Sequence, residues 1–168
     1  MIQIHLIHGD FRTVESLLKL KANFFSLVLI DPPYARQYLS LWESLALAAQ
    51  RVLKLSGFFV SYSGNAFLNQ VIASLDRSAL NYYWMGGVQH QIAGQQSHWN
   101  VINCIKPLLI YNKPPKTCPP GTFVDLLAMG KMEKGCHSWQ QSLDEARVLI
   151  RTFTKPGFGS TGQRNIVI

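Results

Sequence analysis

The segment LVLIDPPY, residues 27–34, combines residue types that could act on an amine. Asp31 follows an apolar run, and the two prolines after it fix the backbone φ angle twice and remove two N–H donors. A carboxylate beside a carbonyl held in a set direction offers two acceptors, which suit the N–H donors of an exocyclic NH₂ group. Tyr34 adds a ring on which a planar base can stack, an interaction worth roughly 1–3 kcal/mol. The segment is interpreted as a receptor for an amine-bearing base; an ordinary strand-to-helix turn is the alternative.

The elements around this segment predict a parallel sheet covered by helices. Residues 26–30, SLVLI, are continuously apolar from Leu27 on, which is typical of a strand buried on both faces. Helical spacing follows over residues 38–55, with Lys54 and Gly57 marking the end. A strand is predicted over 58–63 and a helix over 65–75, with Asn65 as its N-cap. Since ligands gather at the carboxyl ends of parallel strands, we expect Asp31 at such an edge.

The flanking regions add shorter elements. The patterns predict a strand over 2–7 and a short amphipathic helix over 13–20. Two strand-like segments, 80–90 and 101–113, predict an antiparallel hairpin at the sheet edge, because Pro107 favours an edge or a bulge.

The last third of the chain begins with a Pro-rich loop over residues 112–122. A helix is predicted over 142–153, with Ser142 and Glu145 forming a capping box. The final residues predict a Gly-rich turn and a short strand.

The composition is that of one folded domain, residues 1–168, with a basic surface. A net charge of +7 and a pI near 9.5 suit a polyanionic partner, because each neutralised phosphate releases counterions. No apolar run approaches the roughly 18 residues of a membrane span, and no signal peptide is recognisable. Cys104, Cys118 and Cys136 are scattered without a CxxC pair. They predict free thiols in the cytoplasm and no metal site.

Several segments together resemble AdoMet-dependent DNA amino-methyltransferases of the permuted order, in which the catalytic motif precedes the cofactor motif. IDPPY resembles their catalytic motif, and HGDFRTVESLL (8–18) resembles the start of such enzymes. CIKPLLIYNK (104–113) is similar to phage-related members, and CHSWQQSLDEARVLIRTFTKPG (136–157) resembles the motif leading into the cofactor half. The resemblance implies an α/β, Rossmann-like methyltransferase fold, incomplete toward its C-terminal end. Its parts would be a catalytic half (1–111), a Pro-rich and DNA-contacting region (112–135) and a partial cofactor half (136–168).

The resemblance implies transfer of a methyl group from S-adenosylmethionine (AdoMet) to adenine N6 in DNA. Asp31 and the Pro33 carbonyl would accept from the amine, with Pro32 completing the rigid step. Tyr34 would stack on the base after it leaves the duplex. Asp31 favours adenine, since cytosine-N4 enzymes more often have Ser here; cytosine-N4 or RNA methylation stays as an alternative. Protein-glutamine relatives usually have Asn, which argues against a protein substrate.

The resemblance also implies a set of cofactor residues: Asp10, His137, Gln140, Ser142, Phe158, Gly159 and Gly162. Asp10 equally suits a turn, and Ser142 a helix cap. The family has a strand before its glycine-rich loop and a helix after it, whereas here FGSTG leads directly into RNIVI. A shortened gene product and missing segments both explain this difference. A complete chain of this form should bind AdoMet weakly or not at all.

The expected partner is DNA, with no membrane partner and with a homodimer left open. The candidate DNA contacts are Gln95, Gln96 and His98 for base edges, and Lys113 and Lys116 for phosphates. A solvated loop with scattered lysines is the alternative. The competing hypothesis for the whole chain is a DNA-binding remnant that transfers nothing.

Overall fold

The computed structural model describes residues 8–13, 20–89, 100–128, 142–155 and 166–167. Its helices are η1 (Arg36–Tyr38, a 3₁₀ turn), α2 (Leu41–Val52), α3 (Leu68–Leu75) and α4 (Leu143–Phe153). Its strands are β1 (Phe25–Ile30), β2 (Leu53–Tyr62), β3 (Asn81–Gln89), β4 (Ile105–Asn112), β5 (Leu126–Ala128) and β6 (Ile166–Val167). The predicted strand 2–7 and most of the predicted helix 13–20 lie outside the described residues.

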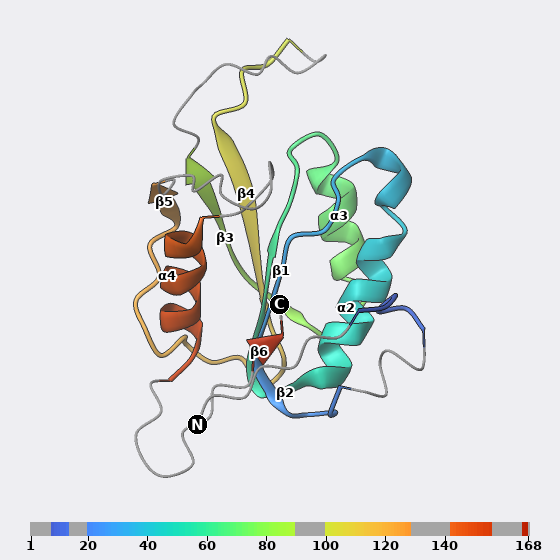
Figure 1. Cartoon of the computed structure of the whole chain (residues 1–168), viewed down its shortest axis with the longest axis vertical. Coiled ribbons are helices and arrows are strands. Elements are labelled where there is room, and N and C mark those ends of the chain that lie inside the picture. The colour runs from blue at the N-terminus through green and yellow to red at the C-terminus, as the bar shows by residue number, and fades with distance from the viewer. Residues whose placement is uncertain (1–7, 14–19, 90–99, 129–141, 156–165, 168) are drawn as a thin grey trace.

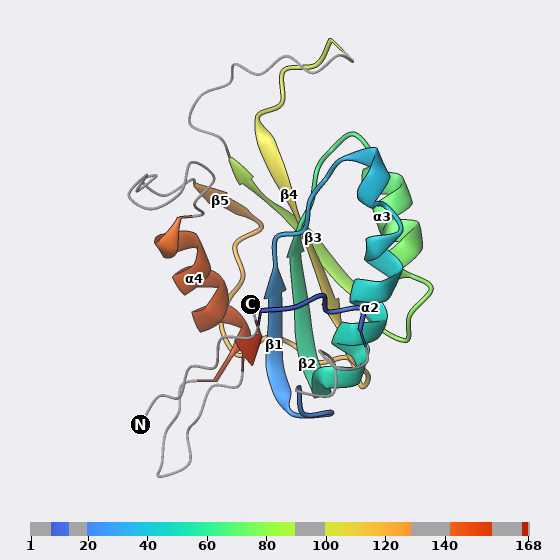
Figure 2. The ribbon, with the colours of Figure 1, turned by 45° about the vertical axis from the view of Figure 1, so that its right-hand side comes forward.

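The strands form one mixed sheet in the order β5-β3-β4-β2-β1-β6. β4 runs antiparallel to both of its neighbours, and the other described pairs are parallel. Helices α2 and α3 lie on one face of this sheet and α4 lies on the other (Figures 1 and 2). The carboxyl ends of β1 and β2 therefore lie beside the amino end of β4, at one end of the central strands.

Alternating side chains along the central strands build two hydrophobic cores, one on each face. On the α2–α3 face lie Val28, Phe59, Leu109 and Tyr111, which pack with Trp42 of α2 and Val71 of α3. On the α4 face lie Leu27, Leu29, Phe58, Val60, Tyr62, Leu108 and Ile110, which pack with Leu149 and Phe153 of α4. Because successive side chains of a strand point to opposite faces, two covered faces require the continuous apolar runs seen in the sequence.

The predicted strand at 26–30 and the helices that follow are confirmed, with shifted ends. α2 ends at Val52, earlier than the predicted end at Lys54, and the chain passes directly into β2. Regular pairing of β2 with β1 begins at Phe58, after an irregularity in which Ser56 has a φ of 60°. The prediction of a strand from Phe58 therefore describes the regular part of a longer element.

The predicted N-cap at Asn65 is wrong. α3 begins at Leu68, and Phe67 occupies the N-cap position. The Asn65 side-chain amide instead donates to the Asn103 side-chain oxygen at 2.7 Å and to the Ile105 carbonyl at 2.6 Å. Asn65 therefore ties the exit of β2 to the entry of β4.

The antiparallel hairpin of β3 and β4 is confirmed, but its place at the sheet edge is wrong. β5 pairs with the outer side of β3, and β4 lies between β2 and β3. Pro107 is tolerated in this inner strand because the β2–β4 ladder ends at Tyr62 and Leu108. Beyond that point the Pro107 carbonyl accepts from the Ser63 backbone N–H at 3.0 Å, and no ladder N–H is needed at the proline.

The helix predicted over 142–153 is confirmed as α4, whereas its capping box is wrong. Ser142 occupies the N-cap position, but its side chain makes no capping hydrogen bond. Glu145 instead accepts a hydrogen bond of 3.4 Å from the hydroxyl of Tyr62, the last residue of β2. Among the described residues, no helix has the length and apolar character needed to cross a membrane.

Candidate active site

Asp31, Tyr62 and Lys106 come together at one end of the central strands and on one face of the sheet. Asp31 follows the last residue of β1, Tyr62 ends β2, and Lys106 is the second residue of β4. Each keeps the alternation of its strand, and so each belongs to the α4 face. Because β4 is antiparallel to β2, its first residues lie beside the last residues of β1 and β2.

The Asp31 carboxylate has a partner on each oxygen. Lys106 Nζ lies 3.1 Å from Oδ2, and the Tyr34 hydroxyl donates to Oδ1. The Asp31 side chain keeps 30% of its surface exposed, whereas that of Lys106 keeps 14%. Asp31 is therefore partly open to solvent, whereas the lysine that pairs with it is mostly buried.

The Tyr34 ring packs between the site and the turn after β2. A Cβ built on Gly64 would lie 2.9 Å from the Tyr34 Cβ, closer than two such atoms normally approach. Glycine at this position therefore leaves room for the Tyr34 side chain beside the exit of β2. The ring is partly exposed, as a platform for a planar ligand would need to be.

Two tyrosine rings also face the Lys106 ammonium. Nζ lies 4.2 Å from the centroid of the Tyr62 ring and 5.3 Å from that of Tyr34. Both distances are within the range in which a cation is attracted to an aromatic face. The head group of Lys106 thus lies among one carboxylate and two aromatic rings.

The first turn of α4 closes this site from the side. Glu145 is 5% exposed, and its Oε2 accepts from the Tyr62 hydroxyl. Ser142, one turn earlier, is also 5% exposed, and its hydroxyl has no hydrogen-bond partner among the described residues. A buried hydroxyl without a partner is uncommon and is a place where a polar ligand group fits.

Burial and these charges shift the proton affinities of the cluster. The pKa of Lys106 is lowered by burial, against the opposing effects of Asp31 and then Glu145. Burial raises the pKa of Tyr34, and the hydrogen bond to Asp31 raises it further. Burial and the negative charge of Glu145 raise the pKa of Tyr62. Both tyrosines therefore remain neutral donors at physiological pH.

The predicted cofactor residues are described only in part. His137, Gln140, Phe158, Gly159 and Gly162 lie outside the described residues. Asp10 is exposed and forms a turn in which its carboxylate accepts from the backbone and guanidinium of Arg12. These hydrogen bonds lower the Asp10 pKa to about 2. The geometry is that of the turn alternative.

Of the predicted DNA contacts, Gln95, Gln96 and His98 also lie outside the described residues. Lys113 has a different role from the predicted one: its ammonium donates to Asn23 Oδ1 at 2.7 Å and to the carbonyls of Gln50 and Leu53 at 2.6 and 2.8 Å. An ammonium has three N–H donors, so none is left for a phosphate in this arrangement.

Lys116, by contrast, lies along an open groove of about 900 Å³. Its Nζ is 5.4 Å from the centroid of the Tyr83 ring, and Trp84 beside it is 51% exposed. The rest of the groove is formed by Cys118, Pro119, Pro120, Gly121, Thr122, Phe123, Val124 and Asp125. We call this feature the Trp84 groove.

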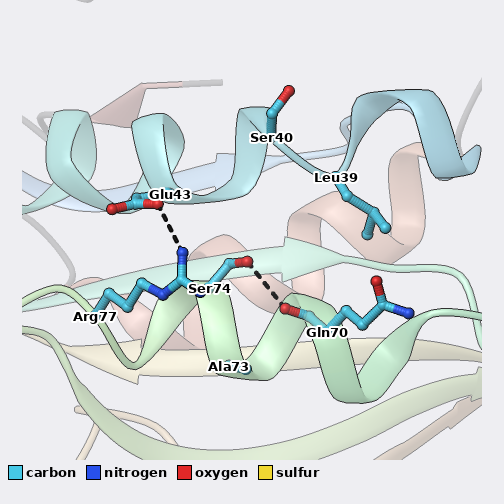
Figure 3. A pocket seen from close by; sticks show the side chains of 7 residues that line it. All are labelled: Leu39, Ser40, Glu43, Gln70, Ala73, Ser74 and Arg77. Atoms are coloured by element: carbon cyan, nitrogen blue, oxygen red, sulfur yellow. Dashed lines mark hydrogen bonds and ion pairs between the residues drawn. The ribbon is translucent and has the colours of Figure 1, made fainter.

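A smaller hollow of about 400 Å³ lies between α2 and α3 and is shown in Figure 3. Arg77 and Glu43 bridge it with an ion pair of 3.0 Å, and the Ser74 hydroxyl donates to the Gln70 carbonyl within α3. These contacts join the two helices to each other or lie within one of them. The hollow is not lined by Asp31 or by the residues described around it, which are Tyr34, Tyr62, Lys106 and Glu145.

Sequence reasoning missed Tyr62, Lys106 and Glu145. The period-two alternation contained the signal for the first two, because each stands an even number of positions from buried residues of the α4 face. The contact of Glu145 with Tyr62 depends on how α4 docks on the sheet, which no local pattern specifies. Among the described residues, no group of three His, Cys, Asp or Glu side chains is placed to hold a metal ion.

Comparison with known proteins relates the chain to solved structures. No family model matches it, and no match was found among the curated proteins. The PvuII DNA methyltransferase, described as cytosine-N4-specific, superposes with a TM-score of 0.74 at 17% identity over 89% of this chain and 70% of that one. The M1.HpyAVI–SAM complex gives 0.69 at 20% identity over 99% and 92%. TTHA0409 of Thermus thermophilus, complexed with S-adenosyl-L-methionine, gives 0.69 at 15% identity over 95% and 84%. The chain therefore has a Rossmann-like methyltransferase fold, as predicted.

Proposed function

We propose that the chain is an AdoMet-dependent DNA methyltransferase that acts on the N6 amine of adenine. The observation that carries the proposal is the exposed Asp31 carboxylate at the end of β1, with the Tyr34 ring directly beside it. The carboxyl ends of parallel strands are where sheets of this kind bind ligands. The similarity to DNA methyltransferase structures supports the same reaction class.

In this proposal the residues of the site bind and orient the amine. Asp31 accepts a hydrogen bond from one N–H of the amine, and the Pro33 carbonyl accepts a hydrogen bond from the second N–H. Both acceptors turn the nitrogen lone pair away from themselves and toward the incoming methyl group. Positioning of this kind supplies much of the rate enhancement, and the Asp31 charge stabilises the positive charge that develops on nitrogen. Tyr34 stacks on the base, and one proton of the methylated amine leaves through Asp31 to solvent.

The residues of the α4 end fit part of the cofactor. The unpartnered Ser142 hydroxyl stands at the N-terminus of α4, where backbone N–H groups favour anionic groups such as a carboxylate. AdoMet, when bound, supplies an activated methyl group on a positively charged sulfur. We assign Ser142 to its amino-acid end, while Asp10 is paired with Arg12 and is not needed for the proposal.

Adenine is proposed as the acceptor because the position before the two prolines is Asp. Among the similar structures, the PvuII enzyme is described as specific for cytosine N4, so that base is the first alternative. Both bases present an exocyclic NH₂ group, and the arrangement of Asp31 and Tyr34 suits either.

The test is methyl transfer from labelled AdoMet to unmethylated DNA, followed by nucleoside analysis. We expect N6-methyladenine from the wild-type chain and a loss of at least about a hundredfold in rate with Asp31→Asn, which keeps the shape and removes the charge. Lys54→Met, at an exposed position of β2, is the control and should transfer normally. Full activity of Asp31→Asn would remove Asp31 from the mechanism, and N4-methylcytosine would change the acceptor.

A second candidate function is DNA binding without transfer, and one feature of the chain order favours it. The segment containing Gly159 and Gly162 follows helix α4 and precedes β6, whereas a cofactor-binding glycine loop follows a strand and opens a helix. Salt-dependent DNA binding, with no labelled methyl group transferred even at high AdoMet concentration, would support this candidate over the first.

A further inference from the structure

We propose that Lys106 is a positioning residue that controls access to Asp31: its ammonium closes the carboxylate at rest and moves toward Glu145 when an amine binds. This inference rests on the proposed function, because it assumes that Asp31 is the acceptor for a base amine. It adds a closed and an open arrangement of the same site.

The contacts of the ammonium define the closed arrangement. Nζ is 3.1 Å from Asp31 Oδ2, and the other carboxylate oxygen accepts from Tyr34. With 14% of its side chain exposed, Lys106 holds this position largely out of water. Its ion pair is therefore less weakened by solvent than a pair on the open surface.

An amine of a base competes with Lys106 for the same acceptor. The ammonium carries a full charge and three N–H donors, whereas the amine of adenine or cytosine is neutral. Both donors would make a hydrogen bond to an ionised acceptor, but only the ammonium adds the attraction between two full charges, so the amine gains little while the ion pair is closed. A cation at 3.1 Å also offsets the negative charge that the transfer reaction needs on Asp31.

Glu145 provides a second carboxylate for the displaced ammonium. It is 5% exposed in the first turn of α4, and its Oε2 accepts from the hydroxyl of Tyr62. Lys106 Nζ already lies over the ring of that same tyrosine, at 4.2 Å from its centroid. Tyr62 therefore contacts the ammonium with its ring and Glu145 with its hydroxyl, so a cation that moves over this ring toward the hydroxyl approaches the second carboxylate and keeps an aromatic contact.

The charged and titratable groups found around Lys106 agree with a movable cation. They are Asp31 and Tyr34 from the exit of β1, Tyr62 from β2 and Glu145 from α4. Both Asp31 and Glu145 favour the charged form of the lysine, while burial opposes it and lowers its pKa. The ammonium is thus attracted from two sides.

The test measures binding without cofactor, using matched single strands that differ only in the amine. One is a mixed-sequence oligonucleotide, and the other has hypoxanthine, with a carbonyl oxygen in place of the amine, at every adenine. We define amine selectivity as the Kd of the hypoxanthine strand divided by that of the adenine strand. A second pair, with uracil replacing cytosine, reports on the cytosine amine.

Lys106→Met should raise amine selectivity about five- to tenfold, because it opens Asp31. Glu145→Gln should lower it, because the ammonium loses its second partner, and Lys106→Arg should stay close to wild type. The double variant Lys106→Met with Glu145→Gln should have the amine selectivity of Lys106→Met, since Glu145 then has no cation to hold. Lys54→Met, the control, should change both Kd values by the same factor. A thermal melt of each variant confirms that it is folded.

Three outcomes would overturn the inference. These are unchanged or lower selectivity in Lys106→Met, an effect of Glu145→Gln that persists without the lysine, or an equal gain in Lys54→Met. If selectivity is lost in Asp31→Asn but does not respond to Lys106, only the inference about Lys106 fails. If wild type, Lys106→Met and Asp31→Asn all bind the two strands equally, the amine receptor itself fails, and the inference fails with it.

Discussion

At the scale of single residues, tyrosine hydroxyls that donate to carboxylates recur around this sheet. Tyr34 donates to Asp31, Tyr62 to Glu145 and Tyr111 to Asp76, the last at 2.9 Å on the face away from α4. Burial is the largest cause of the raised pKa in each. A raised folded-state pKa means that the unfolded chain releases the proton first. Each tyrosine therefore contributes stability that is complete below about pH 10 and is lost as the pH rises above it.

Tyr111→Phe separates this effect from the proposed active site. We expect a loss of about 1–2 kcal/mol at neutral pH, because the hydrogen bond to the Asp76 carboxylate disappears. We also expect a shallower fall of stability above about pH 10 than in wild type. Urea unfolding at a series of pH values measures both. An equally steep alkaline fall in the variant would show that other groups cause it.

At the scale of elements, hydrophobic spacing predicted most of the described helices and strands, because two covered faces leave long apolar runs. It missed what depends on neighbours in space: the inner position of β4, the short strand β5 and the start of α3 after Phe67. The strand–proline–proline segment singled out Asp31 and Tyr34, which the structure places in contact, and their roles toward a base stay predictions. Lys106 was missed because its strand was expected at the sheet edge, with one neighbouring strand, whereas β4 lies between β2 and β3.

Lys113 shows how an element can use a charge that the sequence assigned to DNA. Its ammonium donates to the carbonyls of Gln50 and Leu53, where α2 ends and β2 begins, and a cation is favourable at a helix C-terminus. We expect Lys113→Met to lower the free energy of unfolding by about 2 kcal/mol, since a charged group makes these hydrogen bonds. The midpoint of thermal unfolding should fall by about 4–8 °C. Lys54→Met, at an exposed lysine nearby, should stay within about 0.5 kcal/mol of wild type; equal melting of the two variants would contradict the role of Lys113.

At the scale of the whole molecule, the charge of +7 predicts that DNA binding weakens steeply with salt. Lys116 and the exposed Trp84 make the Trp84 groove the described surface best suited to a nucleic-acid strand, with a cation for phosphate and a ring for stacking. In plots of log K against log salt concentration, Lys116→Met should reduce the slope by about 1. Lys113→Met should leave the slope unchanged, because its ammonium is bound within the fold. Equal slopes for wild type and Lys116→Met would exclude Lys116 as a phosphate contact.

The direction of β4 has an evolutionary consequence. β3 ends at Gln89 and β4 begins at Ile105, and both points lie at the edge of the sheet that carries Asp31. An insertion between them starts and finishes beside the proposed site, and the ladder from Asn81 to Gln89 need not change register to accept it. Exchange of this connection between homologues would be a short route to new substrate preferences on an unchanged scaffold.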